Sequence, residues 1–216
     1  MRASWASFVA GAIAGGSSVA VYVLWMSRRR RRLLFLSAPY KCGEYGIGVH
    51  PVKDGDVTIR LATPGDAHKM IALIQGLALY ERKPISTVEV TEANLVADGF
   101  GPNPRFHCLL AEIDNGDAIG FAFVYPSYST WQGLCHYLED LFVDEKHRGR
   151  GLGALLLKSV AAIAYAQGCK RLHWNALDWN TPALKFYESV GAKRLDEWVT
   201  LRMGRPEIAA LLGRSS

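Results

Sequence analysis

The chain has 216 residues, half of them apolar and 11% aromatic, which suits one well-buried domain with an appendage and leaves little room for two full domains. Its net charge of +5 is uneven, because residues 1–56 carry eight Lys or Arg against three acids, whereas residues 57–216 carry seventeen of each. This balance argues against nucleic acid as the partner of the domain. The four scattered cysteines include no CxxC pair and argue against a disulfide framework and a zinc site, so we expect no metal.

The first part of the chain is apolar and ends in an arginine run. No charged residue occurs from Ala3 to Ser27, and five arginines follow at once, Arg28 to Arg32. As a helix rising about 1.5 Å per residue, residues 6–26 would cross about 30 Å of hydrocarbon. Arginines on the C-terminal side of such a segment predict a single-pass membrane anchor with the rest of the chain in the cytosol.

A cleaved targeting segment is the alternative for this leader. Its first acidic residue is only Glu44, which also fits a mitochondrial or plastid address. The following stretch contains two prolines and four glycines and reads as a linker. We therefore expect an anchor or targeting segment over residues 1–32, a linker over 33–56 and one domain over 57–216.

The first half of the domain predicts a strand, two helices and a hairpin. "VTIRLA" alternates as a strand does, and Thr63 with Pro64 is a typical start for the apolar helical pattern that follows to Glu81. Thr91 can cap a second, short helix that stops before Gly99. The strands "FHCLLAEID" and "AIGFAFVYP" flank "NGD", which suits a tight turn with positive φ.

The second half alternates strands with helices. "LCHYLEDLFV" is an apolar strand, and a helix with leucines on one face begins near Gly151. "RLHWNAL" predicts another strand, Asn180 caps a helix that ends before Gly191, and "EWVTLRM" predicts a last strand. This order indicates an α/β fold with a mixed, mostly antiparallel sheet and helices on both faces.

The stretch "DEKHRGRGLGALLL" joins a strand to a helix through a glycine-rich loop. Backbone N–H groups and a helix dipole would converge there, which favours an anionic phosphate, although a turn built only for geometry remains the alternative. The pattern GxGxxA also fits a dinucleotide-binding turn, but such a turn follows the first strand of its domain. A phosphate-binding P-loop requires "GK" before Ser or Thr, which is absent from this stretch.

"RGRGLG" resembles the acetyl-CoA pyrophosphate signature R/Q-x-x-G-x-G/A of the GNAT N-acetyltransferases. In addition, "LALYE", "DGFGPNPRFHCLLAE", "YLEDLFVDEKHRGRGLG" and "DWNTPALKFYESVGA" resemble the diamine acetyltransferase branch, and are nearest to its thialysine-acetylating members. The resemblance implies the GNAT fold from Val57 to about Leu212, a homodimer, and acetyl transfer from acetyl-CoA to a primary amine. The implied acceptors are small diamines or lysine-like amines: thialysine, ornithine, diaminopropane or polyamines.

The resemblance also implies roles for individual residues. Glu139 would draw the proton off the amine through water, and Tyr187 would protonate the departing thiolate, although by pattern alone the first could be an ordinary strand residue and the second a core residue. The implied acetyl-CoA contacts are Leu141, Phe142, Val143, Arg148, Gly149, Arg150, Gly151, Leu152, Gly153, Ala154, Asn180, Thr181, Pro182 and Ala183. The implied substrate contacts are Tyr80, Glu81, Trp131, Glu139, His173, Trp174, Asn175 and Asp178.

One loop bears on the choice of amine. The polyamine enzyme carries an acid two residues before the tryptophan, whereas this chain has Ser129 before Trp131. Losing that carboxylate removes a site for a second ammonium, which favours lysine-like or shorter diamines over spermidine. Two other functions remain open: a catalytically silent, membrane-anchored domain that binds acetyl-CoA, and a protein or peptide N-acetyltransferase.

Overall fold

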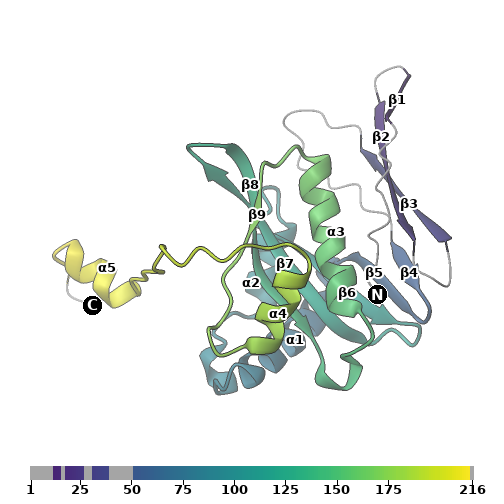
Figure 1. The fold of residues 1–216 in the computed structure, drawn as a ribbon. Coiled ribbons are helices and arrows are strands. Elements are labelled where there is room, and N and C mark those ends of the chain that lie inside the picture. The colour runs from purple at the N-terminus through teal and green to yellow at the C-terminus, as the bar shows by residue number, and fades with distance from the viewer. Residues whose placement is uncertain (1–11, 16–17, 27–30, 39–50, 215–216) are drawn as a thin grey trace. The chain divides into compact units, whose positions relative to one another are not determined.

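The computed structural model describes residues 12–15, 18–26, 31–38 and 51–214 (Figure 1). The chain divides into two compact units, Met1–Trp174 and Asn175–Ser216, and each is taken here by itself. Half of the predicted linker, residues 39–50, and part of the arginine run, residues 28–30, lie outside the described residues.

In the residues that the structure describes, the leader does not form the helix that its hydropathy predicted. Where the structure describes it, the chain forms three antiparallel strands in the order β1–β2–β3, and no described helix is long and apolar enough to cross a membrane. The prediction of a membrane-spanning helix over residues 6–26 is therefore not supported. Valine and isoleucine favour strands and glycine disfavours helix, so apolarity alone misread this stretch. The strands are Ala12–Gly15, Ser18–Met26 and Arg31–Ala38.

The main sheet has six strands in the order β4–β5–β6–β7–β8–β9, antiparallel except for the β8–β9 pair. This confirms the mixed, mostly antiparallel α/β prediction. The sheet starts inside the predicted linker, because a short strand before Gly55 folds back on the first predicted strand. The strands are Val52–Asp54, Val57–Leu61, His107–Ile113, Ala118–Ser129, Gly133–Val143 and Leu172–His173.

Helices lie on both faces of this sheet (Figure 1). On one face α1 and α2 pack over a core that includes Met70, Phe121 and Phe142. On the other, α3 lies over strands β5 to β8 and buries an apolar side formed by Leu152, Leu156, Val160 and Ile163. The helices of this unit are α1 (Ala67–Tyr80), α2 (Glu92–Phe100) and α3 (Leu152–Ala166), with short 3₁₀ turns at Pro64–Asp66, Ile85–Thr87 and Glu145–His147.

Local signals in the sequence set several of these boundaries. The Thr91 side chain accepts a hydrogen bond from the Asn94 N–H at 3.2 Å, which confirms it as the cap of α2. Gly116 has a φ of +92°, as a tight hairpin between β6 and β7 requires. The Asn115 side chain supports that turn by accepting from the Asp117 N–H at 2.9 Å.

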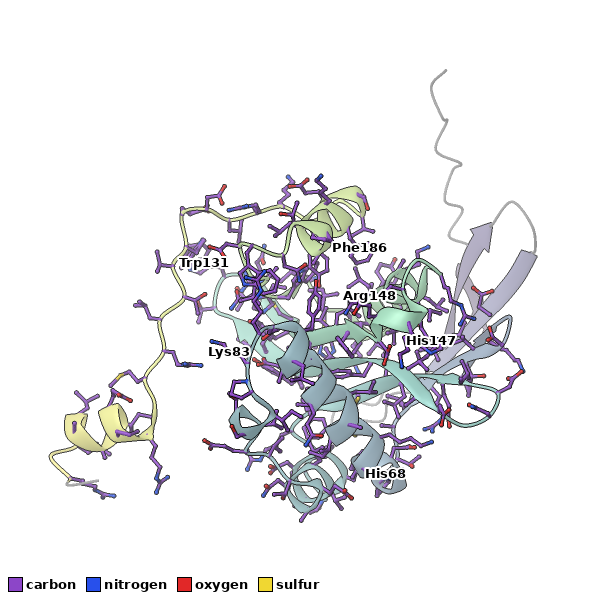
Figure 2. The ribbon with its side chains drawn as sticks, turned by 90° about the horizontal axis from the view of Figure 1, so that it is seen from below. His68, Lys83, Trp131, His147, Arg148 and Phe186 are labelled. Carbon is purple, nitrogen blue, oxygen red and sulfur yellow. The ribbon has the colours of Figure 1, made fainter. Side chains whose placement is uncertain are left out.

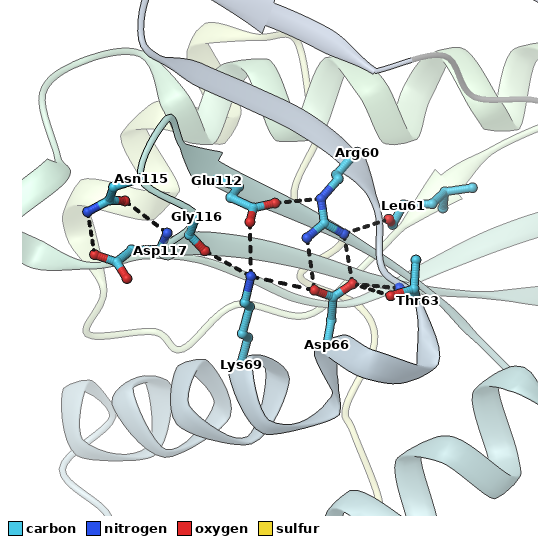
Figure 3. Close-up of polar contacts among 9 residues, drawn as sticks. All are labelled: Arg60, Leu61, Thr63, Asp66, Lys69, Glu112, Asn115, Gly116 and Asp117. Carbon is cyan, nitrogen blue, oxygen red and sulfur yellow. Dashed lines mark hydrogen bonds and ion pairs between the residues drawn. The ribbon is translucent and has the colours of Figure 1, made fainter.

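Four charged side chains form an ionic cluster at the N-terminal end of α1 (Figure 3). Arg60 on β5 donates two hydrogen bonds to the Asp66 carboxylate, at 2.7 and 2.8 Å. Lys69 on α1 donates to Glu112 on β6 at 2.9 Å and to the Gly116 carbonyl at 2.8 Å. Arg60 also donates to Glu112, so two cations and two carboxylates tie α1 to two strands and a hairpin.

The C-terminal unit holds α4 (Thr181–Ser189) and α5 (Arg205–Leu211), the second of which the sequence did not predict. Of the last two predicted strands, the first is confirmed only in part and the second is wrong. "RLHWNAL" pairs only at Leu172–His173, and "EWVTLRM" lies in a stretch without regular structure. A strand needs a neighbour for its N–H and C=O groups, and no described strand pairs with residues 197–203.

Candidate active site

The glycine-rich loop between β8 and α3 has the geometry of an anion site. Gly149 and Gly151 have φ values of +76° and +81°, while an added Cβ at either would meet no atom within 4 Å, so glycine is needed for conformation and not for space. The first hydrogen bond of α3 runs from the Leu155 N–H to the Gly151 carbonyl at 3.0 Å. The N–H groups just before it, those of Leu152, Gly153 and Ala154, are available to phosphate oxygens.

The strand that leads into this loop has one backbone edge without a strand neighbour. Leu141, Phe142 and Val143 pair with β7 on one side. On the other side β8 pairs with β9 only at His136 and Tyr137, so no described strand continues along the last part of β8. An extended ligand arm could form hydrogen bonds with this edge as a strand would, which agrees with the residues predicted to hold acetyl-CoA.

A β-bulge interrupts β8 at Glu139. Asp140 pairs with Phe123 and Leu138 with Val124, which leaves Glu139 as the extra residue. Tyr137 and Asp140 consequently share the face of the sheet that carries α1, where Tyr137 stacks on Tyr125 with 5.2 Å between ring centroids. The bulge thus places two adjacent acids at one spot, the first exposed and the second half-buried.

We call Glu81, Glu139 and Asp140 the acidic cluster. Burial, followed by the charges of Glu139 and Glu81, raises the pKa of Asp140 to about 7. Burial also raises the pKa of Glu81, with Lys83 acting against it. Tyr125 adjoins the same group, because burial, the charge of Glu139 and a hydrogen bond to it raise the Tyr125 pKa to about 12. A group that titrates near neutrality and lies beside other carboxylates suits both cation binding and proton transfer.

The end of α1 presents two of the predicted substrate residues. Tyr80 is its last residue and Glu81 its C-cap. Arg82 then adopts a φ of +61°, which few residues other than glycine do, and the Lys83 N–H returns to the Ala78 carbonyl at 2.9 Å. This left-handed cap stops the helix directly after the pair and fixes Glu81 beside Asp140.

The remaining predicted substrate residues of this unit are spread more widely. The His173 Nε2 lies 3.0 Å from the Ser127 Oγ, and its ring meets Tyr137 edge-on at 5.0 Å, which joins it to the aromatic side of the acidic cluster. Burial, with a smaller effect of Arg171, lowers its pKa. Trp174 follows it in the chain and is half-buried. Trp131 lies at the β7–β8 turn and is 87% exposed.

The two arginines of the loop have different partners. The Arg148 guanidinium lies over the Tyr80 ring, 4.3 Å from its centroid, and its Nε donates to the Val143 carbonyl at 2.9 Å (Figure 2 labels Arg148). Arg150 pairs instead with Asp56, on the turn between β4 and β5. Both were predicted as acetyl-CoA contacts. In the structure both guanidinium groups contact protein groups, Tyr80 and Val143 for Arg148 and Asp56 for Arg150.

The predicted acid Tyr187 belongs to the C-terminal unit. It lies on α4, half-buried, with its ring 5.3 Å from that of Phe186. Asn180 caps this helix as predicted, accepting from the Ala183 N–H at 3.3 Å, and Thr181 and Pro182 form its first turn. Asn175 and Asp178, predicted to contact substrate, are exposed residues of the same unit.

Sequence reasoning missed three members of the site. Asp140 was passed over in favour of its neighbour, and Tyr125 and Tyr137 were read only as strand residues. The available signal was the pair "ED" inside an apolar strand. It could not reveal which acid is buried, because that depends on the bulge.

Residues 72–192 match the Acetyltransferase (GNAT) family. Thialysine N-epsilon-acetyltransferase from Bos taurus is 39% identical over 168 residues, which are 73% of this chain and 98% of that protein. The chain belongs to the GNAT acetyltransferase family. It is accordingly an N-acetyltransferase, with acetyl-CoA as co-substrate.

Two further comparisons agree with membership of the GNAT family. The human spermidine/spermine N(1)-acetyltransferase-like protein 1 is 36% identical over 159 residues, which are 69% of this chain and 23% of that protein. Among solved structures, an integron cassette protein from the mobile metagenome of V. cholerae has a TM-score of 0.61 and 25% identity, covering 74% of this chain and 99% of its own. The fold and the glycine-rich loop predicted from sequence agree with this membership.

Proposed function

We propose that this GNAT protein transfers an acetyl group from acetyl-CoA to one primary amine of a small diamine or a lysine-like substrate. The observation that carries the proposal is the acidic cluster, set among Tyr80, Tyr125 and Tyr137 next to the end of β8. Carboxylates and aromatic faces are what a cationic alkyl chain requires. The similarity to thialysine N-epsilon-acetyltransferase supports the same class of acceptor.

The proton balance follows from the charges in the site. An alkylammonium has a pKa of about 10.4, so the acceptor arrives protonated and must lose a proton before its nitrogen can attack. Asp140, with a pKa of about 7, and the adjacent Glu139 are the proposed acceptors of that proton, directly or through water. Acetyl-CoA supplies a thioester whose carbonyl carbon gains the C–N bond as its C–S bond breaks. We propose that Tyr187 donates its phenol proton to the sulfur. The second proton that the nitrogen loses as the amide forms passes to solvent, from which Tyr187 regains its own.

A panel of amines tests this function. Thiol release from acetyl-CoA is followed with thialysine, ornithine, 1,3-diaminopropane and spermidine. We expect faster turnover with the first three, because Ser129 stands where a carboxylate would bind a second ammonium. The transfer proposal fails if acetyl-CoA binds and no amine releases thiol. If the protein acetylates a peptide and excess diamine does not inhibit that reaction, the acceptor is a peptide and not a diamine.

The role of Tyr187 is tested by Tyr187→Phe. We expect turnover to fall by about a hundredfold or more, because general acid catalysis contributes at least that much, while the acetyl-CoA Kd stays within about twofold. Tyr165→Phe is the matched control, since Tyr165 is 69% exposed on α3. Equal turnover in Tyr187→Phe and wild type would remove Tyr187 from the mechanism.

We further propose that the leader targets the protein to a membrane surface or an organelle. The support is compositional: an apolar stretch without charge, the arginine run, and no acid before Glu44. Residues 1–40 fused to a fluorescent reporter, followed with protease protection, test this. A diffuse reporter fully open to protease would contradict it.

A homodimer is the proposed assembly. Its support is the resemblance of the sequence to the diamine acetyltransferase branch, which implies a homodimer. Light scattering on the purified chain should give twice the monomer mass, and a monomer at micromolar concentration would rule the dimer out.

A further inference from the structure

We propose that Arg148 couples the acetyl-CoA loop to the amine pocket. The inference rests on the proposed function and concerns the loop arginine that precedes the two positive-φ glycines. Its backbone belongs to the anion-binding loop, whereas its guanidinium lies over Tyr80, a residue at the end of α1 beside the acidic cluster. One side chain therefore touches both halves of the site.

Three contacts fix this side chain. Its Nε donates to the Val143 carbonyl at 2.9 Å, its guanidinium carbon is 4.3 Å from the Tyr80 ring centroid, and it is 5.8 Å from that of Phe142. Both ring distances lie within the range of about 6 Å over which a cation is attracted to an aromatic face. Arg148 thus bridges the end of β8 and the end of α1.

An anion bound in the loop would act on this bridge. Arg148 remains exposed, so its charge is accessible to a phosphate held by the neighbouring N–H groups. A negative charge there would hold the guanidinium in place, and the ring of Tyr80 would be held with it. Because Tyr80 is followed directly by Glu81, ordering the ring also orders one carboxylate of the acidic cluster.

Arg150 shows that the contact is not a general property of the loop. It lies two residues further on, yet pairs with Asp56 near the start of the main sheet and has a second, longer contact to His147 at 3.4 Å. Among the described residues, its guanidinium lies over no aromatic ring. It therefore serves as the comparison within the same loop.

The test measures the Kd of thialysine by calorimetry, with and without saturating coenzyme A. We expect bound coenzyme A to tighten amine binding about two- to fivefold in the wild type, the size of an exposed cation–π contact. Arg148→Lys keeps the charge and loses the planar group, so the gain should fall below about 1.5-fold. Arg150→Lys should keep the gain, and Arg105→Lys, an exposed arginine on another loop, controls for the substitution itself.

A double variant makes the test specific to Tyr80. Tyr80→Leu should abolish the gain, and Arg148→Lys added to it should cause no further loss, because the two residues act through one contact. The inference is overturned if the wild type shows no gain, or if Arg148→Lys weakens coenzyme A binding and leaves the gain intact. Turnover without coupling would refute only this inference, whereas coupling without turnover would refute only the transfer proposal.

Discussion

The two ends of α1 use acidic residues in opposite ways. At its N-terminal end Asp66 is buried against Arg60 and near Lys69. The Arg60 hydrogen bonds, followed by those from Thr63, hold the Asp66 pKa well below its usual range. At its C-terminal end Glu81 lies near Asp140, which has Glu139 beside it in the chain, and burial with like charge raises the Asp140 pKa to about 7. The first arrangement favours a fixed charge and the second favours a movable proton.

The difference separates stabilising residues from reactive ones. A paired carboxylate in the ionic cluster adds to folding stability and has no reason to exchange protons near neutrality. An acid in the acidic cluster costs stability when ionised, and it remains useful only because a cationic substrate can replace the missing counter-ion. Substitutions at the two ends should therefore affect different measurements.

The largest expected effect is on turnover, in Asp140→Asn. We expect kcat/KM to fall by about a hundredfold or more, since the variant loses a proton acceptor. In the wild type kcat/KM should rise with pH and level off above about 7, as Asp140 becomes ionised, and the variant should lack this limb. The pH–rate profiles of wild type, Asp140→Asn and Glu139→Gln measure both effects and distinguish the two carboxylates.

Whereas Asp140→Asn should lower turnover, it should not lower folding stability near neutral pH. Its folded pKa lies above the ordinary value of about 3.9, so the stability that its protonated form provides is present below pH 4 and is lost as the pH rises towards 7. Asp140→Asn should therefore be at least as stable as the wild type at pH 8 in urea unfolding. If Asp140→Asn were clearly less stable and had normal turnover, Asp140 would be a stabilising residue like Asp66 and not a reactive one.

Asp66→Asn should mainly reduce stability. Removing one partner of a buried ion pair leaves Arg60 without one of its two counter-charges, which costs about 3 kcal/mol of unfolding free energy. Turnover at a permissive temperature should stay within about twofold. Because the folded pKa of Asp66 is depressed, its contribution is present above about pH 4 and is lost as the pH falls further, so wild type and variant should converge in acid.

The smallest effect is expected at the exposed pair Lys53 and Asp114. Their charged atoms lie 2.8 Å apart, but both side chains are more than half exposed, and solvent screens such pairs. Lys53→Ala should change the unfolding free energy by about 0.5 kcal/mol or less. A loss comparable with that of Asp66→Asn would show that burial does not distinguish the two ion pairs.

The sequence predicted elements whose signals are local. Thr91 and Asn180 cap helices where they were expected to, and Gly116 turns the β6–β7 hairpin. Elements that depend on distant partners were less predictable. The stretch 197–203 has a strand-like pattern but no described partner strand, and residues 18–26 are apolar enough for a helix but form β2.

The candidate site was predictable to the same extent. The glycines of the loop are visible in the sequence because their function is conformational. The roles of Glu139 and Tyr187 were implied by the resemblance to the family and stay predictions. The pKa of Asp140 and the ring contact of Arg148 arise from residues far apart in the chain, so no pattern in the sequence contained them.

The bulge at Glu139 inserts one residue into β8, so the numbering of the residues that face α1 changes from odd to even. Before it, odd-numbered residues such as Tyr137 face α1, and after it even-numbered residues such as Asp140 and Phe142 do. Deleting Glu139 would make Leu138 and Asp140 consecutive opposite Val124 and Phe123, which restores a regular ladder and leaves Asp140 and Phe142 facing α1. The bulge therefore adds a second carboxylate beside Asp140 while the strand residues on either side of it keep their own faces of the sheet.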